Sequence, residues 1–246
     1  MAKMNKYQMA VQQAEDNANA TRVENDGFVL HEYPDYKTYR DVQVAGNKAK
    51  LNAQFVPELH VRKLSRWLNA KLGRPVEFGI CHGTRQGKEQ MWFKKHLQGD
   101  PNVIGTDISE TCLQFPDSMI WDFHEENPEW EGKADFIYSN SWDHAYDPIK
   151  AFRAWDKCLK PTGVLILDHT TGQQPQSANA LDPFGATLGG LFNVVEQAVG
   201  THKDQIALLD YREKNPEYPA RVLIVRKPSA LRMSLACAAG DLDQVV

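Results

Sequence analysis

The sequence predicts an α/β fold, a three-layer sandwich around a mostly parallel, seven-stranded sheet with an antiparallel C-terminal hairpin strand. Two observations support this prediction. From Pro75 onward, short apolar runs alternate with segments of helical spacing, which is typical of a parallel sheet with right-handed crossovers. Near the end, two apolar runs are joined by a turn around Asn215 and Pro216, so they are expected to form a hairpin in which one strand is antiparallel.

Length and composition limit the classes of protein to which the chain can belong. Its 246 residues suffice for one large domain, and 42% hydrophobic with 24% charged residues is ordinary for a globular protein. The net charge of −4 supplies no basic surface for phosphates, so no nucleic-acid partner is predicted. No apolar run approaches eighteen residues and no signal-peptide pattern opens the chain, so we expect no membrane contact and a cytoplasmic location.

Helices are predicted where apolar residues recur every three or four positions. Residues 48–72 have this spacing, and Pro57 is expected to break the helix into two pieces. The first twenty residues are interpreted as a loose helix or a mobile tail, and the Gly- and Gln-rich stretch 171–190 as a long loop. Three further segments have helical spacing: 86–97, 148–159 and 190–199.

Strands are predicted where short apolar runs end in glycine or polar residues. Seven segments fit this description: 75–80, 102–107, 119–123, 134–139, 164–167, 205–211 and 221–225. The strands and their helices would form one domain at 73–228. Residues 1–72 would precede it as a helical extension or lid, and residues 229–246 would follow it as a tail.

The first predicted strand and its turn form the first candidate site. The segment from Val76 to Gly87 reads VEFGICHGTRQG, in which Glu77 and several glycines precede a predicted helix. Glycines at such a turn let the backbone approach a ligand closely. Taken alone, the segment fits a nucleotide-type cofactor and a tight strand-to-helix turn equally well.

Acidic residues end the second and third predicted strands. The carboxylate of Asp107, at the tip of the second strand, can accept hydrogen bonds from both hydroxyls of a ribose. The alternative is that Asp107 caps the next helical segment, which aspartate also does well. Asp122, at the end of the third strand, is placed to accept from an adenine amino group.

A fourth segment runs from Asp135 to Leu167, beginning DFIYSNSWDHAYDP and ending LKPTGVLIL after a helix. In their order, the four segments resemble the class I, Rossmann-like superfamily of S-adenosylmethionine-dependent methyltransferases, especially the small-molecule group often called type 11. The resemblance covers about residues 75–227 and is most specific in the fourth segment. It implies S-adenosyl-L-methionine as cofactor and methyl transfer to a small-molecule acceptor.

The resemblance also implies which residues contact the cofactor. Those expected to orient the turn or to lie beside the methionine part, sulfonium and amino group are Glu77, Gly79, Gly83, Ser139 and Asn140. Those expected to contact the ribose and the adenine are Asp107, Ile108, Asp122 and Phe123. Cys81 stands where the family has the middle glycine of the turn.

Two histidines are candidate catalytic residues because they follow strands at the carboxyl edge of the sheet. His144 follows the fourth strand and His169 the fifth, and a histidine of near-neutral pKa suits proton removal from an oxygen or nitrogen acceptor. For His144, a structural hydrogen bond within its loop is an equal alternative. His124, beside two glutamates, is interpreted as part of a solvated turn.

We predict no metal site. Asp143, Asp168 and His169 include the oxygen ligands that suit Mg²⁺, but they do not reproduce the pattern of metal-dependent O-methyltransferases. The four cysteines are widely scattered without a CxxC pair, which favours a reducing compartment. Three tyrosines before the first helix are expected either in a lid over the cofactor or in a plain surface loop: Tyr33, Tyr36 and Tyr39.

Three alternative functions stay open. An NAD-dependent oxidoreductase fits the segment from Glu77 to Asp107, although this segment lacks GxGxxG and a terminal hairpin is not a dehydrogenase feature. A nucleic-acid methyltransferase would show Asn/Asp-Pro-Pro-aromatic after the fourth strand, where Ser-Asn-Ser-Trp stands. A non-catalytic cofactor-binding protein on the same fold is the third alternative. The acceptor and the oligomeric state are not predicted.

Overall fold

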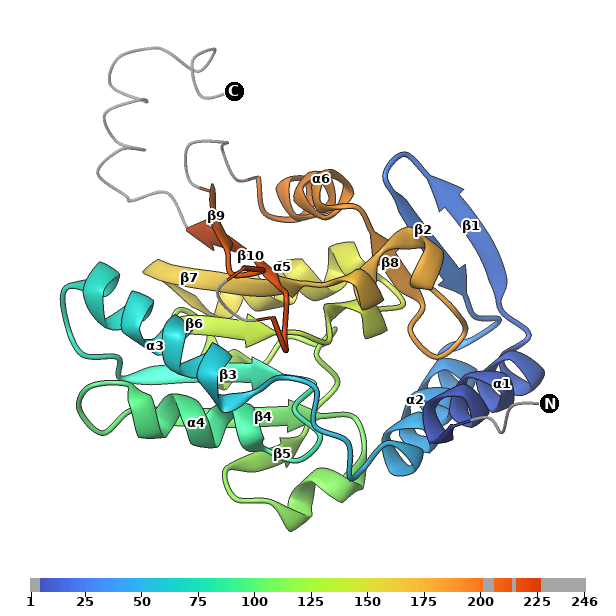
Figure 1. The fold of residues 1–246 in the computed structure, drawn as a ribbon, viewed down its shortest axis with the longest axis horizontal. Helices are drawn as coiled ribbons and strands as arrows, with labels where there is room; N and C mark the ends of the chain where they lie inside the picture. The colour runs from blue at the N-terminus through green and yellow to red at the C-terminus, as the bar shows by residue number, and fades with distance from the viewer. Residues whose placement is uncertain (1–4, 201–205, 214–215, 227–246) are drawn as a thin grey trace.

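A seven-stranded sheet forms the centre of the computed structural model, which describes residues 5–200, 206–213 and 216–226 (Figure 1). Its strand order is β5-β4-β3-β6-β7-β10-β9. Strands β3 to β7 pair in parallel, whereas β10 is antiparallel to both β7 and β9, which confirms the predicted fold. The strands are β3 (Phe78–His82), β4 (Asn102–Asp107), β5 (Ser118–Ile120), β6 (Ala134–Ser139), β7 (Leu159–His169), β9 (Ile206–Asp210) and β10 (Arg221–Arg226).

Helices cover both faces of this sheet, because neighbouring residues of each strand point to opposite sides. Phe136 and Tyr138 of β6 pack with α3 (Glu58–Leu72) and α4 (Lys88–His96) on one face. Ile137 packs with α5 (Pro148–Cys158) and α6 (Leu188–Val199) on the other. Both clusters are buried, and each large apolar side chain removed from water stabilises the fold by about 1.5–3 kcal/mol.

Several predicted boundaries need correction. β3 lies about two residues later than the strand predicted at 75–80, and β7 extends through the turn that the sequence predicted before residue 164. Of the helix predicted at 48–72, only the part after Pro57 forms, as α3; residues 50–57 are not helical. Phe55, whose spacing suggested a helix, is 52% exposed and therefore does not contribute to a buried helical face.

The N-terminal region contains more regular structure than the sequence predicted. It comprises α1 (Lys6–Ala18), β1 (Thr21–Asn25), β2 (Phe28–Glu32) and α2 (Tyr36–Ala49). The hairpin β1–β2 forms a second, antiparallel sheet with β8 (Phe184–Ala186), inside the stretch predicted to be a loop. Figure 1 shows α1 and α2 beyond the carboxyl ends of β3 and β4.

Some predictions fall outside the part of the chain that the structure describes. They concern the tail at 229–246, Gln205 at the start of a predicted strand, and Asn215 in the hairpin turn. Among the described residues, none of the helices combines the length and the apolar character needed to cross a membrane.

Candidate functional site

Two adjoining cavities lie at the carboxyl edge of the large sheet, beneath α2. Cavity A is open to solvent and is bordered by the ends of β4 and β5 and by α2, including Asn47, Asp107, Ile108, Asp122 and Phe123. Cavity B is also open to solvent and is bordered by the turn after β3, the loop after β6 and the segment before β8, including Thr84, Glu89, Asn140, Asp143, Asp182 and Tyr218. The two share Lys50, Gly83, Arg85, Ser141 and His144.

Asp107 ends β4 in the wall of cavity A. Its Oδ1 accepts hydrogen bonds from the Asn47 side chain at 2.8 Å and from the Ser109 N–H at 2.9 Å. Its Oδ2 accepts from the Arg85 N–H at 3.0 Å. Burial raises the pKa of Asp107, and these donors act in the opposite direction. The carboxylate therefore caps a turn and also borders the cavity, so both sequence interpretations have a geometric basis.

Asp122 borders cavity A just after the end of β5. Burial opposes its ionisation, but hydrogen bonds from His124 and from the Tyr36 hydroxyl lower the pKa of Asp122. Phe123 and Ile108 add apolar surface to the same cavity. His124 is fully buried against Asp122, so its interpretation as a solvated turn was wrong.

The three tyrosines predicted to lie near the cofactor are in contact with this region. Tyr39 borders cavity A, and the Tyr36 hydroxyl donates to Asp122 at 2.8 Å. The Tyr33 hydroxyl donates to the Ala180 carbonyl at 2.6 Å, which joins the start of α2 to the segment before β8. This arrangement is compatible with a cover over the cavity.

The turn after β3 approaches the loop after β6 closely at Gly83. Gly83 has φ +73°, and a Cβ there would lie 2.6 Å from the Ser141 Cβ, so only glycine fits without displacement. Arg85 also has a positive φ, 43°, and its side chain borders both cavities. The turn therefore presents Gly83-Thr84-Arg85 to the cavities.

The structure does not bring two of the predicted cofactor residues to this turn. Glu77 precedes β3 at the opposite edge of the sheet, where its side chain is 75% exposed and pairs with Lys160. Gly79 lies inside β3, and a Cβ there would lie 2.2 Å from the Phe136 ring. The reason is the position of β3 along the chain: the strand begins after Glu77 and ends at His82, so both residues lie before the turn.

Of three residues predicted at the carboxyl ends of β6 and β7, Asn140 borders a cavity, whereas Ser139 and His169 make structural contacts. The Ser139 hydroxyl is buried, donates to the His82 carbonyl and accepts from the Ser141 N–H, and so links β6 to β3. Asn140 borders cavity B. His169 lies in neither cavity: its Nε2 contacts the Ala186 carbonyl at 2.9 Å, and its ring stacks on Trp142.

His144 stands where the two cavities meet. Gln43 donates its amide N–H to the Leu181 carbonyl at 2.8 Å, so the Gln43 oxygen faces His144 and accepts from Nδ1 at 2.8 Å. With the proton of the neutral ring on Nδ1, Nε2 is unprotonated and lies 3.4 Å from Asp182 Oδ1. Burial lowers the pKa of His144 to about 4, although Asp182 acts to raise it. At neutral pH the ring is therefore neutral with Nε2 unprotonated, and its pKa lies below the near-neutral value that the sequence analysis expected for a general base.

Asp182 is the main site residue that sequence reasoning missed. Its Oδ1 lies 3.4 Å from His144 Nε2 and 3.4 Å from Lys50 Nζ, and its Oδ2 accepts from the Tyr7 hydroxyl at 2.7 Å. Burial alone would raise its pKa, but Lys50 and His144 lower the pKa of Asp182 to about 2. The available signal was a twenty-residue stretch without predicted structure, which is unusual inside a compact domain.

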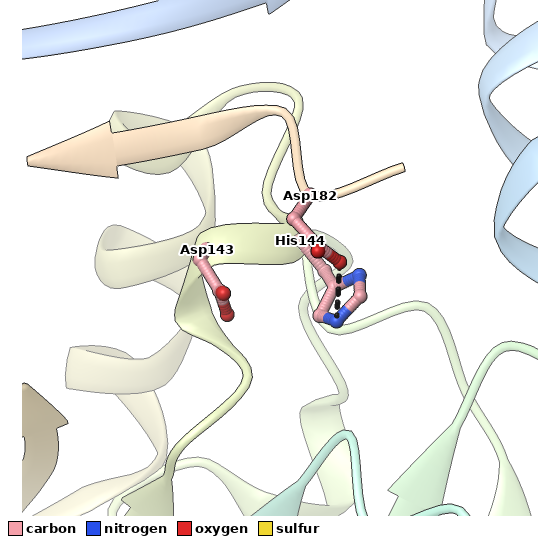
Figure 2. A group of neighbouring side chains, drawn as sticks. All are labelled: Asp143, His144 and Asp182. Atoms are coloured by element: carbon pink, nitrogen blue, oxygen red, sulfur yellow. Dashed lines mark ion pairs between the residues drawn. The ribbon is translucent and has the colours of Figure 1, made fainter. Parts of the chain in front are cut away.

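Asp143, His144 and Asp182 place one ligand-type atom each within 4.8 Å of one another (Figure 2). Their donor types would suit a divalent cation. However, Lys50 Nζ already provides a positive charge beside Asp182 Oδ1. Asp168, considered with Asp143 from the sequence, is held elsewhere by three buried partners: His60, Tyr138 and Tyr218.

Comparisons with known proteins give a result for the fold. No protein-family model matches the sequence, and no curated protein matches it either. Among solved structures, the 1,6-didemethyltoxoflavin-N1-methyltransferase of Burkholderia thailandensis, with bound 1,6-didemethyltoxoflavin and S-adenosylhomocysteine, has a TM-score of 0.56 and 16% identity, covering 85% of this chain and 99% of that one.

Two further solved structures are similar. The N-methyltransferase NodS from Bradyrhizobium japonicum WM9, in complex with S-adenosyl-L-homocysteine, has a TM-score of 0.54 and 10% identity, covering 76% of this chain and 98% of that one. The [4+2]-cyclase SpnF has a TM-score of 0.51 and 12% identity, covering 73% and 86%. At these identities the likeness concerns the fold: the chain has the fold of class I S-adenosylmethionine-dependent methyltransferases.

Proposed function

We propose that this chain is a methyltransferase that uses S-adenosyl-L-methionine and methylates a small-molecule acceptor. The observation that carries the proposal is the meeting of cavities A and B at Gly83, Ser141 and His144. Cavity A would hold the methyl donor, and cavity B the acceptor. A methyl group passing between them would cross the boundary beside His144.

The residues of cavity A fit the cofactor. The wall of cavity A combines carboxylates with apolar side chains, as small-molecule sites do. Asp107 would accept from the ribose hydroxyls, and Asp122 from the adenine amino group. Ile108 and Phe123 would contact the adenine faces, and Gly83 would let the backbone approach the methionine part.

The bound cofactor would supply a methyl group on a sulfonium, so the protein mainly has to align the acceptor and exclude water. His144 would accept the acceptor's proton at Nε2, with Gln43 fixing the orientation of its ring. Helix α2 covers this edge of the sheet through Tyr39, Gln43 and Asn47. We therefore propose that residues 1–72 act as the cover of a domain that spans 73–228.

Other observations support the proposal without fixing the acceptor. Two structurally similar proteins were solved with S-adenosylhomocysteine, whereas SpnF is a cyclase, so this fold alone does not determine the reaction. Cys81, Cys112 and Cys158 are buried, and none of the three forms a disulfide within the described part of the chain. These thiols suit the reducing cytoplasm that we propose as the location.

A calorimetric titration of the full chain with S-adenosylhomocysteine, and separately with NAD, tests the proposal. We expect saturable binding of S-adenosylhomocysteine at one site and no heat from NAD. A protein saturated at a hundred times the dissociation constant should gain about 2.7 kcal/mol of stability, visible as a higher melting temperature. Binding of NAD alone, or no binding of S-adenosylhomocysteine at millimolar concentration, would refute the proposal.

A further inference from the structure

Cavity B concentrates buried polar atoms that lack a hydrogen-bond partner. Within residues 5–200, 206–213 and 216–226, four such atoms belong to residues that border this cavity: Thr84 Oγ1, Arg85 Nε, Glu89 Oε2 and Asp143 Oδ1. Buried polar atoms in folded proteins are almost always paired, and an unpaired one calls for an explanation. Four of them around one cavity indicate a polar ligand.

Glu89 gives the strongest of these indications. The residue is only 5% exposed and lies in the first turn of α4, directly behind the turn that carries Gly83 and Arg85. Its Oε1 accepts from the Gln54 amide at 3.0 Å, while Oε2 has no hydrogen-bond partner among the described residues. A carboxyl oxygen buried in this way is suited to a ligand that brings a hydrogen-bond donor.

The positive charges near the cavity are already engaged elsewhere. Lys50 pairs with Asp182, and its Nζ lies 5.6 Å from the centre of the Tyr7 ring. The Arg85 guanidinium donates to the Ala53 carbonyl and lies over the Phe55 ring. For Glu89 and Asp143, no ion pair is found within the described part of the chain.

Protons compensate for the missing counter-ions in the free protein. Burial raises the pKa of Glu89 to about 7, with Asp168 adding to this effect and Gln54 and Arg85 opposing it. Burial and the charge of Asp182 raise the pKa of Asp143 well above its usual range, against Lys50 and a hydrogen bond from Gln173. A cation in the cavity would take the place of these protons.

Resting on the proposed methyl transfer, we propose that the acceptor is an amine, which cavity B binds as an ammonium between the carboxyl groups of Asp143 and Glu89. An ammonium brings several N–H donors, which match Asp143 Oδ1 and Glu89 Oε2. A hydroxyl or carbonyl elsewhere on the amine would accept from Arg85 Nε. The Tyr218 ring supplies an aromatic surface in the same cavity, and its hydroxyl is held by a hydrogen bond to Asp168.

The reaction balances without any further reagent. The ammonium loses one proton to His144 Nε2, which leaves a neutral amine whose lone pair attacks the methyl carbon. The new N–CH₃ bond forms as the S–CH₃ bond breaks, and the sulfur keeps that electron pair as a neutral thioether. The product leaves as a methylated ammonium, and the proton on His144 passes to solvent.

The test uses the full chain saturated with S-adenosylhomocysteine, titrated calorimetrically with matched probes. Tyramine, tyrosol and 4-hydroxyphenylacetate share one skeleton and end in an amine, an alcohol and a carboxylate; histamine with its alcohol and carboxylate counterparts forms a second set. We expect at least one amine to bind at least tenfold more tightly than its counterparts. Equal or tighter binding of the alcohols or carboxylates, or binding of none of the amines, would overturn the proposal.

Proton release provides a second measurement that a purely structural role would not change. Repeating the titration at pH 7 in buffers of different ionisation enthalpy should show about one proton released per amine bound and none per alcohol. Asp143→Asn should weaken amine binding at least tenfold and reduce this release to the share that Glu89 contributes, while Glu213→Gln on the exposed surface should change neither. An amine that binds Asp143→Asn as tightly as the natural protein would exclude the proposed contact.

The same samples separate this inference from the proposed function. If S-adenosylhomocysteine binds and no amine is preferred, methyl transfer stands and the acceptor class is wrong. If S-adenosylhomocysteine does not bind, the proposed function itself fails. Methyl transfer to a bound amine would be confirmed by mass spectrometry, with the added methyl group located on nitrogen.

Discussion

The two cavities differ in how their carboxyl groups are satisfied. In cavity A, Asp107 accepts hydrogen bonds from three partners, and Asp122 is held by His124 and Tyr36. In cavity B, Asp143 and Glu89 each keep one buried oxygen without a partner among the described residues. The carboxylates of cavity A are therefore held by the protein itself, whereas under the proposed function the acceptor would complete the contacts of cavity B.

This difference follows from where the residues come from. Cavity A is built on the ends of β4 and β5, where short local turns such as Asp107 to Ser109 fix each carboxylate. Cavity B combines the end of α2, the start of α4 and the segment before β8, which the chain brings together from distant positions. This difference agrees with the proposed function, in which cavity A would hold the cofactor and cavity B the acceptor.

The largest expected effect lies at the boundary between the two cavities. His144→Ala should lower turnover by about 10² to 10⁴-fold, because the ring at the boundary would no longer accept the acceptor's proton. Binding of S-adenosylhomocysteine, measured by calorimetry, should stay within about twofold because Asp107 and Asp122 are unchanged. His96→Ala, which removes a partner of Glu58 on α3, is the control and should leave turnover unchanged.

A smaller kinetic loss would give His144 a different role. If turnover falls less than tenfold and the change appears mainly in the acceptor's KM, the ring positions the acceptor and is not a base.

The pH dependence of stability tests whether the buried carboxyl group of Glu89 in cavity B has a raised pKa. The folded pKa of Glu89 is raised to about 7, so its contribution to stability is complete below its unfolded pKa and is lost as pH rises toward 7. Glu89→Gln removes this loss, so the variant should gain stability relative to the natural chain between about pH 4.5 and pH 7, by up to about 3 kcal/mol. Urea unfolding of both proteins at pH 5 and pH 8 measures this change in their relative free energy of unfolding.

A difference in stability that does not change between these two pH values would contradict this interpretation. Glu89 would then be ionised in the folded protein, with a partner that compensates for its charge. Glu126→Gln, at an exposed ion pair with Lys157, serves as the control and should give the same small difference at both pH values.

Cavity A could be predicted from the sequence more completely than cavity B. Asp107 and Asp122 were identified because they follow locally readable apolar runs, and Ile108 and Phe123 beside them through the family resemblance; all four border cavity A. Their contacts with the cofactor stay a prediction. The fold was confirmed for the same reason, since β4 and β6 have the bounds that were predicted.

The residues of cavity B depend on contacts that no local pattern reveals. Asp182 reaches His144 only because β8 pairs with β2, and β8 has just three residues. Lys50 is placed by the end of α2, in a stretch predicted to continue as helix. Glu89 was predicted to lie on a helix, but nothing in its sequence context shows that its side chain turns toward the cavity. Of the residues that border cavity B, the sequence analysis named Gly83 and Asn140 through the family resemblance and His144 because it follows the fourth strand.

A substitution of intermediate effect tests whether the Asp107 carboxylate in cavity A binds the cofactor in addition to capping a turn. Asp107→Ala removes hydrogen bonds to two ribose hydroxyls and should weaken S-adenosylhomocysteine binding by about 1.5–3 kcal/mol. Some loss of melting temperature is also expected, because Asp107 accepts from Asn47, Ser109 and Arg85. A variant that melts lower but binds normally would show that Asp107 acts only as a turn cap.

The smallest effect tests where the wall of cavity A begins. The sequence placed Gly79 beside the methionine part of the cofactor, whereas the structure places it in β3, where an added Cβ would lie 2.2 Å from the buried Phe136 ring. Gly79→Ala should therefore cost about 1–3 kcal/mol of stability through overpacking, with S-adenosylhomocysteine affinity unchanged. Gly189→Ala is the matched control, because its nearest neighbour lies 4.0 Å away, and it should melt no lower than the natural chain. If Gly79→Ala instead melts normally and loses the ligand, Gly79 contacts the cofactor and the wall of cavity A extends further along β3.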